Sequence, residues 1–538
     1  MFGLRTILVC AKNRFSTIKT SWVGRVIHPL TLMMPIDQMH DENEKEVFKR
    51  TLNLFDLIAV GLGAIIGAGI FVLVGNAAAD FAGPAVILSF VLAGFVALLA
   101  ALSFAEMSTM VPLAGSSYSF TYATMGEFAA WLLGWDLILE NVIAVALVSN
   151  GWALYVRTLF TDTLHVNVEE SILKSWIGWN QTTESFNRTG FALNLPAAII
   201  VLALTLLLVY DINGSVFVNN IIVIFKVVAI LIFIFASIKF IKKENYEPFI
   251  PKNEGSSNKF GVSGMFRATT LAFFAYTGFD GITTVAQDTK KSSRNNLPIA
   301  ILSSFGISAV LYIGFCLALI GVVPYDQLGV VSPVLMAAQK IGMNWLAITI
   351  HLAAIASLTS VALINIMVES KILYSMANDG LLPEFLALIY ETRRTPYTAT
   401  IFTGVISAIF ASLLPIEFLS EISSIGTLFS YFLVHAGLFI MRWTKNKDVK
   451  HSFNFPSRTY VIPILGGIIS ILLMHTMSKW AKMRFGVWMA VGVIVYFLYG
   501  RKKSKLRNRK KKIETVTNIF DTTNANDSIV SKTETYPI

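Results

Sequence analysis

The chain has 538 residues, of which 55% are hydrophobic and 14% are charged. A water-soluble protein has to cover its core with polar side chains, and this composition supplies too few of them, so it excludes an ordinary soluble domain. The net charge of +10 would suit nucleic acid, but the densest basic run, residues 501–512, directly follows the last apolar segment. That placement favours contact with the anionic lipid of a bilayer, and we predict no nucleic-acid partner.

The N-terminal residues 1–52 are predicted to form a cytoplasmic tail. The first 36 residues are basic and contain no acidic side chain before Asp37. They lack the apolar core and the small-residue cleavage site of a secretory signal peptide, and a targeting presequence is the alternative interpretation.

Twelve apolar segments follow, and each is long enough to cross a hydrocarbon core of roughly 30 Å as a helix. Because they are continuously apolar, whereas barrel strands alternate, the sequence predicts an all-α integral membrane protein with one transmembrane domain over residues 53–500. The segments are expected to begin near residues 54, 85, 128, 193, 215, 266, 299, 344, 398, 418, 460 and 484.

The first apolar segment contains four glycines close together, Gly61, Gly63, Gly67 and Gly69. An unpaired backbone group is costly in lipid, so a helix is broken there only where another group satisfies the backbone. A bound solute can be that group. The alternative is a small-residue face that packs against a neighbouring helix.

The third segment carries Asp136 and Glu140 one helical turn apart, and therefore on one face. Carboxylates inside a membrane are candidates for a function. Glu140 is the deeper of the two and is suited to attract the cationic side chain of a substrate. The alternative is a protonated carboxyl group that makes a hydrogen bond between packed helices.

The loop after the third segment contains two acceptor patterns for N-glycosylation, at Asn180 and Asn187. Lys and Arg are more numerous in the connections on the opposite side, which predicts that both termini are cytoplasmic and that this loop lies outside. We therefore predict glycosylation at both asparagines, although a third pattern at Asn213 falls on the predicted cytoplasmic side. The plasma membrane is the first choice of location, and a lysosomal or vacuolar membrane is the second.

The fifth segment contains Lys226 without an acidic residue in the same span. Desolvation disfavours the charged form of a lysine at this depth, so Lys226 is predicted to take up and release a proton. The alternative is a fixed structural cation that donates hydrogen bonds to the carbonyl groups of a broken helix. Both interpretations place Lys226 beside the break in the first segment.

The sixth segment again places glycines and polar residues, over residues 273–281, near the centre of an apolar span. Interruptions at matching positions of two halves are typical of transporters built from inverted repeats, which bind their substrate between the broken helices. We therefore predict one repeat over residues 53–241, a second over residues 265–442, and two further helices within residues 460–500.

The two predicted breaks suit a zwitterion. Backbone N–H groups begin the second half of the first helix and suit a carboxylate, whereas carbonyl groups end the preceding half-helices and suit an ammonium group. An α-amino acid carries both groups on one carbon. We therefore predict a substrate site made by Ala64, Ile65, Gly67, Ala68, Gly69, Glu140, Phe274, Ala275, Thr277 and Phe279.

Four further charged residues, Glu106, Asp280, Glu369 and Lys371, lie near predicted ends or breaks of the apolar segments. Gate-closing ion pairs and plain solvation at the membrane surface are both compatible with these positions. Solvation is the simpler interpretation of each residue alone. Glu106 and Asp280 are the predicted gate residues.

Other functional classes find little support in the sequence. The seven histidines and two cysteines lack metal-ligand spacing, and neither a Ser/His/Asp set nor a phosphate-binding loop is evident. We predict no enzymatic activity, no metal and no cofactor, with a proton as the candidate coupling ion. Residues 501–538 are predicted to be a basic and then disordered cytoplasmic tail. The oligomeric state is left open, and a monomer is compatible with the sequence.

Six motifs occur in order along the chain, at residues 62–71, 105–118, 134–140, 220–226, 274–280 and 370–383. Together they resemble the amino acid–polyamine–organocation superfamily and, within it, the cationic amino acid transporter family. This resemblance implies a LeuT-type fold of ten core helices plus two. It also implies that the amides of residues 67–69 bind the substrate carboxylate, and that Lys226 takes the place of a sodium ion in proton-linked members.

Three positions depart from the pattern of that family. Gln287 stands where an acidic residue is usual, Asn141 where an aromatic residue is common, and Lys371 where arginine is usual. The resulting prediction is a secondary amino acid transporter, proton-coupled or facilitative, that works by alternating access and favours cationic amino acids such as arginine and lysine. A carrier of neutral or small amino acids with the same fold and a transporter-like amino acid sensor are the alternatives.

Overall fold

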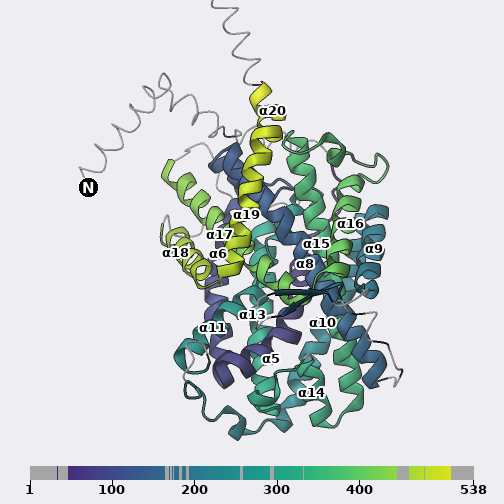
Figure 1. Ribbon diagram of the computed structural model, residues 1–538, viewed down its shortest axis with the longest axis vertical. Helices are drawn as coiled ribbons and strands as arrows, with labels where there is room; N and C mark the ends of the chain where they lie inside the picture. Colours follow the sequence, from purple (N-terminus) through teal and green to yellow (C-terminus); the bar gives the residue numbers. More distant parts are fainter. Residues whose placement is uncertain are drawn as a thin grey trace, which may run out of the picture.

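Helices account for most of the chain, and they lie side by side in a bundle (Figure 1). The predicted tails before residue 47 and after residue 509 lie outside the described residues, apart from Met33. The computed structural model describes residues 33, 47–163, 166, 169, 173, 175–180, 185–188, 193–254, 259–290, 296–330, 332–444, 460–477 and 479–509.

Seven helices within the described residues are long and apolar enough to cross a membrane. They correspond to α6 (Val86–Met110), α8 (Glu127–Thr158), α10 (Ile212–Ser237), α13 (Leu297–Val322), α15 (Asn344–Asn378), α17 (Ile416–Thr444) and α19 (Lys479–Val495). Four shorter apolar helices accompany them: α4 (Leu54–Ile65), α9 (Leu195–Tyr210), α16 (Tyr397–Leu413) and α18 (Val461–Thr476).

Large apolar side chains cover the outside of this bundle. Leu206 is 69% exposed, and Val310 is 73% exposed. A contiguous surface of this kind is costly in water and favourable in lipid. The predicted class, a helical protein embedded in a membrane, is confirmed by these helices and their outer faces.

The two helix interruptions predicted from the glycines are present. α4 ends at Ile65, the backbone of Ile66 is extended, and the helical conformation resumes at Ala68 before the π-helical turn η1 (Gly69–Leu73). In the sixth segment, α11 (Gly261–Ala275) is separated by five residues in turns from the single helical turn α12 (Gly281–Thr284).

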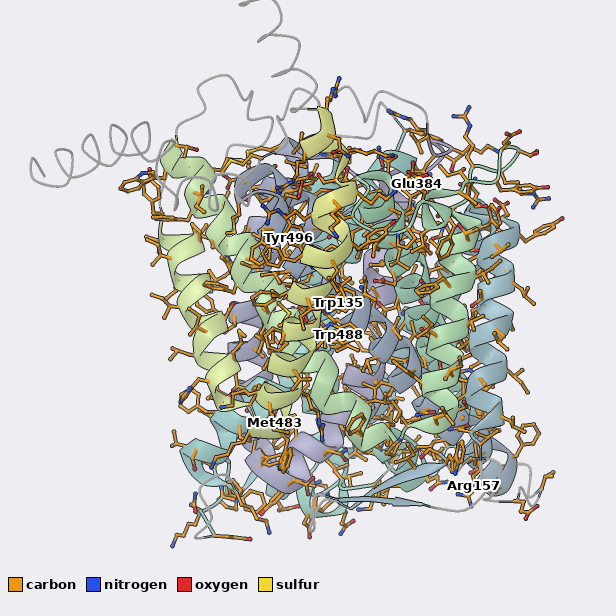
Figure 2. The ribbon with its side chains drawn as sticks, turned by 45° about the horizontal axis from the view of Figure 1, so that its top comes forward. Trp135, Arg157, Glu384, Met483, Trp488 and Tyr496 are labelled. Atoms are coloured by element: carbon orange, nitrogen blue, oxygen red, sulfur yellow. The ribbon has the colours of Figure 1, made fainter. Side chains whose placement is uncertain are left out.

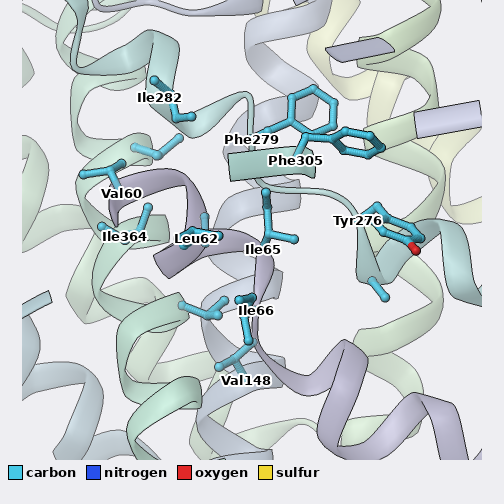
Figure 3. Packing of buried hydrophobic residues seen from close by; sticks show 14 of the residues in the cluster. Val60, Leu62, Ile65, Ile66, Val148, Tyr276, Phe279, Ile282, Phe305 and Ile364 are labelled. Atoms are coloured by element: carbon cyan, nitrogen blue, oxygen red, sulfur yellow. The ribbon is translucent and has the colours of Figure 1, made fainter. Parts of the chain in front are cut away.

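The first broken helix lies among other helices of the bundle. α4 packs against α10, α13 and α15, and α15 in turn packs against α8. The start of α4 is fixed by Asn53, whose side chain accepts hydrogen bonds from the first turn. The Asp56 side chain in turn accepts a hydrogen bond from the backbone N–H of Asn53. Buried apolar side chains, including those of Ile65 and Ile66, surround the break (Figure 3).

The loop after α8 contains a short antiparallel hairpin that the sequence does not predict. Its strands are β1 (Ile177–Asn180) and β2 (Ser185–Arg188), paired so that Ile177 lies opposite Arg188. The all-α prediction is therefore wrong for this loop. Asn180 and Asn187, the predicted glycosylation sites, belong to these two strands.

Candidate functional site at two broken helices

The two helix breaks pack directly against each other. A Cβ atom on Gly278 would lie 3.0 Å from the carbonyl carbon of Ala64, and one on Gly69 would lie 2.7 Å from the Cα atom of Ala275. Gly278 also has a φ of +110°, which side-chain-bearing residues rarely adopt. Glycine at these two positions therefore allows the backbones to approach, and the last turn of each half-helix contacts the opposite break.

Lys226 reaches the first break from α10. Its Nζ atom donates to the carbonyl oxygens of Ile66 at 2.8 Å and Gly63 at 3.1 Å, and the lysine is fully buried. Ser357 of α15 donates a second hydrogen bond of 2.8 Å to the Ile66 carbonyl. These donors satisfy carbonyl groups that lose their helical partners where α4 ends. Lys226 thus lies beside the break, as both interpretations of the sequence require.

Tyr312 of α13 connects the two breaks, and sequence reasoning missed it. Its hydroxyl oxygen lies 2.7 Å from the carbonyl oxygen of Ile65 and 2.9 Å from that of Ala275. A phenol has one proton, so it donates to one of these carbonyls at a time. The signal that could have found it is a tyrosine in a strongly apolar helix, because a buried hydroxyl usually has a polar partner.

The other predicted residues of the second break form its wall. Thr277 donates from its hydroxyl to the carbonyl oxygen of Phe274 at 2.9 Å, within the turn itself. Phe279 is buried, and its ring packs edge-on against those of Phe104 and Phe305. Figure 3 shows Phe279 and Phe305 above the first break, so the surroundings of the two breaks are largely apolar.

Glu140 of α8 faces α17. Val148 of the same helix is beside Ile66 at the first break (Figure 3). Glu140 precedes it by two turns of helix, or about 12 Å along the axis. One oxygen of its carboxyl group accepts a hydrogen bond from Thr427 of α17, and the other has no partner in the described residues. Tyr431, one helical turn after Thr427, donates to Asp280, and its ring packs against that of Phe279, so α17 connects the surroundings of Glu140 with the second break.

Glu369 and Lys371 are both fully buried, so the interpretation that they are solvated at the membrane surface is wrong. Glu369 accepts a hydrogen bond of 3.1 Å from Asn141, one of the residues that depart from the family pattern. Lys371 forms an ion pair with Asp288, which is 3% exposed. Both side chains project from α15 into the bundle. Their location near the end of an apolar segment does not indicate this direction.

The two predicted gate residues have different partners. Glu106 of α6 forms an ion pair with Arg442 of α17, with a distance of 3.0 Å between the Arg442 Nε and Glu106 Oε1 atoms. The pair therefore connects two helices. Asp280 instead accepts hydrogen bonds from the backbone N–H of Gly278 at 3.2 Å and from the Tyr431 hydroxyl at 3.4 Å. Its carboxyl group thus helps to shape the second break.

Comparisons with known proteins agree with this architecture. A family model for amino acid permeases matches residues 52–506. The branched-chain amino acid permease BcaP of Bacillus subtilis is 39% identical over 459 residues, covering 85% of this chain and 94% of that protein. The methylthioribose transporter of the same organism is 35% identical over 473 residues, covering 88% and 98%. Cationic amino acid transporter 5 of Arabidopsis thaliana is 28% identical over 475 residues, covering 86% and 78%. The resemblance inferred from the motifs is thereby confirmed, and the chain belongs to the amino acid permease family.

Proposed function

We propose that this permease carries L-amino acids across a membrane as a secondary transporter that works by alternating access. The observation that carries the proposal is the contact between two broken helices, with Gly278 against Ala64 and Gly69 against Ala275. One break falls in each proposed repeat, residues 53–241 and 265–442. Twelve spans, arranged as a LeuT-like pair of inverted five-helix repeats plus two helices, complete the proposed architecture.

The proposed site recognises the two charged groups that all α-amino acids share. The N–H groups of residues 67–69, at the start of a new helical stretch, bind the carboxylate. The carbonyl groups of Ile65 and Ala275 bind the ammonium group, which takes over the acceptors that the Tyr312 hydroxyl otherwise contacts. Recognition of this kind requires no charged side chain at the breaks.

The apolar surroundings favour a neutral, branched or other apolar side chain on the substrate. Ile65, Ile66, Phe279 and Phe305 are buried around the breaks, and the relative BcaP is named for branched-chain amino acids. Cationic amino acids are the second candidate class. Glu140 and the relatives named as cationic amino acid transporters support that class.

Proton coupling through Lys226 is proposed on its position, because loss of its proton would remove the positive charge and one of the three N–H donors that Nζ directs at the first break and at Ser360. Cytoplasmic termini, glycosylation at Asn180 and Asn187, and a plasma-membrane location rest on the distribution of basic residues and on the acceptor patterns. The proton is the proposed coupling ion, and no cofactor is invoked.

Reconstitution of the purified protein into liposomes tests the proposal. Uptake of labelled leucine and arginine is measured at two pH values, with all twenty amino acids and methylthioribose as competitors. We expect concentrative or exchange uptake that apolar L-amino acids inhibit best. Binding without flux would indicate an amino acid sensor, and inhibition by methylthioribose alone would indicate a substrate of another class.

A further inference from the structure

The end of the last span and the chain that follows it dock on the bundle. After α19 the chain continues as η12 (Tyr496–Gly500) and α20 (Arg501–Lys503), and residues 496–509 are here called the C-terminal segment. Figure 1 shows α20 at one end of the bundle. Figure 2 shows Tyr496 and Glu384 toward the same end.

The inner face of the C-terminal segment is held by Glu127, the first residue of α8. Glu127 is fully buried and accepts hydrogen bonds from the Tyr496 hydroxyl at 2.8 Å and from the Ser504 hydroxyl. Arg507 forms an ion pair of 3.3 Å with the same carboxylate. The backbone N–H of Lys505 donates to the carbonyl oxygen of Asp379, just after α15. The segment therefore joins the ends of α8 and α15.

The outer face of the C-terminal segment carries several cations that form no ion pair within the part of the chain that the structure describes. Lys502, Lys503, Lys505 and Arg509 are exposed, and residues 501–512 contain no acidic side chain. Like charges so close together repel one another and oppose docking of the segment. Just before them, Leu498 is 66% exposed on a span whose outer face is apolar, so the cations lie where a bilayer surface would begin.

A cleft opens beside these cations. It has a volume of about 250 Å³ and is lined by Gly380, Leu382, Glu384, Tyr499 and Lys503. A Cβ atom on Gly380 would lie 2.6 Å from the carbonyl oxygen of Lys503, so the loop after α15 and the segment are in direct contact at its base. The cleft thus combines one acid, one cation and a phenol at the edge of the apolar surface.

We propose that the outer face of the C-terminal segment binds the headgroups of anionic phospholipids, and that bound lipid holds the segment on Glu127. Lipid phosphates neutralise the repulsion among the four exposed cations, while Arg507 stays on the protein side. The lipid therefore stabilises the connection between α8 and α15. This inference concerns stability and does not depend on the substrate that the permease carries.

Thermal unfolding of the full-length protein in neutral detergent tests the proposal without a transport assay. We expect added phosphatidylglycerol to raise Tm by several degrees more than phosphatidylcholine does. The triple variant K502Q/K503Q/K505Q should lose this difference. The matched control K242Q/K243Q/K252Q removes the same charge at the opposite end of the bundle and should keep the difference between the two lipids. This end is identified by the backbone N–H of Lys242, which donates to the carbonyl oxygen of Gly321 in the last turn of α13.

Three results would overturn the proposal. Equal stabilisation by both lipids, or an unchanged response of the K502Q/K503Q/K505Q variant, shows that the surface does not select anionic headgroups. Full stabilisation by inositol hexakisphosphate or inorganic phosphate shows a site for free phosphate instead of lipid. The Glu127→Gln variant removes the anchor for Arg507 and should show a smaller lipid response; an unchanged response shows that lipid does not act through this contact.

Discussion

The hydroxyl group of Tyr312 lies 2.7 Å from the carbonyl oxygen of Ile65, at the end of the first half-helix. It lies nearly as close, at 2.9 Å, to the carbonyl of Ala275 at the end of the second. One side chain therefore links the two breaks and occupies the acceptors assigned to the substrate ammonium group. A transport cycle that separates the breaks has to break at least one of these contacts.

The Tyr312→Phe variant should bind amino acids more tightly while folding less stably. Removal of the hydroxyl leaves two buried carbonyls without this donor, which costs about 1–3 kcal/mol of stability. The substrate ammonium then binds them without competition, so the apparent KM for uptake should fall and Tm should fall with it. A KM that rises or stays the same would show that the hydroxyl does not compete with the substrate.

The Gly69→Ala variant should separate the two breaks. The new methyl group would lie 2.7 Å from the Cα atom of Ala275, a backbone atom that cannot move aside alone. We expect a loss of about 1–3 kcal/mol in stability and a large loss of uptake.

Gly306→Ala is the matched control for Gly69→Ala. Gly306 lies in α13 with nothing within 4 Å of the added atom, and the change should leave uptake and Tm unchanged or raise Tm slightly. Equal behaviour of the two variants in uptake and unfolding assays would contradict the close contact between the breaks.

Lys226→Met should abolish the pH dependence of uptake, because the variant has no amine that titrates at the first break. The two carbonyls that Lys226 contacts each lose one of their two donors, Ser357 and Ser360 remaining, so Tm should also fall. Uptake measured across a pH series separates the interpretations. A lower Tm with an unchanged pH response of the remaining uptake assigns Lys226 a purely structural role.

Breaking the ion pair between Lys371 and Asp288 should be among the most destabilising single changes outside the breaks. Both residues are almost fully buried, and Lys371→Met leaves a carboxylate without its cation, at a cost of about 3–5 kcal/mol. Adding Asp288→Asn should recover part of this loss in thermal unfolding. If the Tm of the double variant is no higher than that of Lys371→Met alone, the two residues do not act as a pair.

The helix breaks could be predicted because glycine clusters contradict a continuous helix in an apolar segment. Lys226 could be placed beside the first break for a similar reason, since a lysine at that depth needs acceptors. Both inferences depend on local sequence and on the cost of unpaired polar groups in lipid.

The remaining site depends on contacts between distant segments. The two acceptors of Tyr312 are Ile65, far away in the sequence, and Ala275, so no local pattern pairs them with it. Glu369 and Lys371 were assigned to solvent from their position along α15, but the direction in which a side chain faces decides burial. The hairpin of β1 and β2 was missed because strands of four residues give almost no periodic signal.

Glu140→Gln decides between the two substrate classes. The change keeps the size of the side chain and an oxygen for the Thr427 hydroxyl, so the packing of α8 against α17 should survive and Tm should change little. Because Glu140 is bonded to Thr427 and supplies none of the backbone groups assigned to the substrate carboxylate and ammonium, leucine uptake should remain, whereas a cationic side chain that extends toward this carboxyl group loses its partner. Competition assays with arginine and leucine should therefore show a selective loss for arginine if cationic substrates are carried.

Glu369→Gln is the matched control on α15, since the amide oxygen still accepts from Asn141. An equal effect of Glu140→Gln on both substrates would make Glu140 a structural residue and would leave the apolar walls of the two breaks to select the side chain.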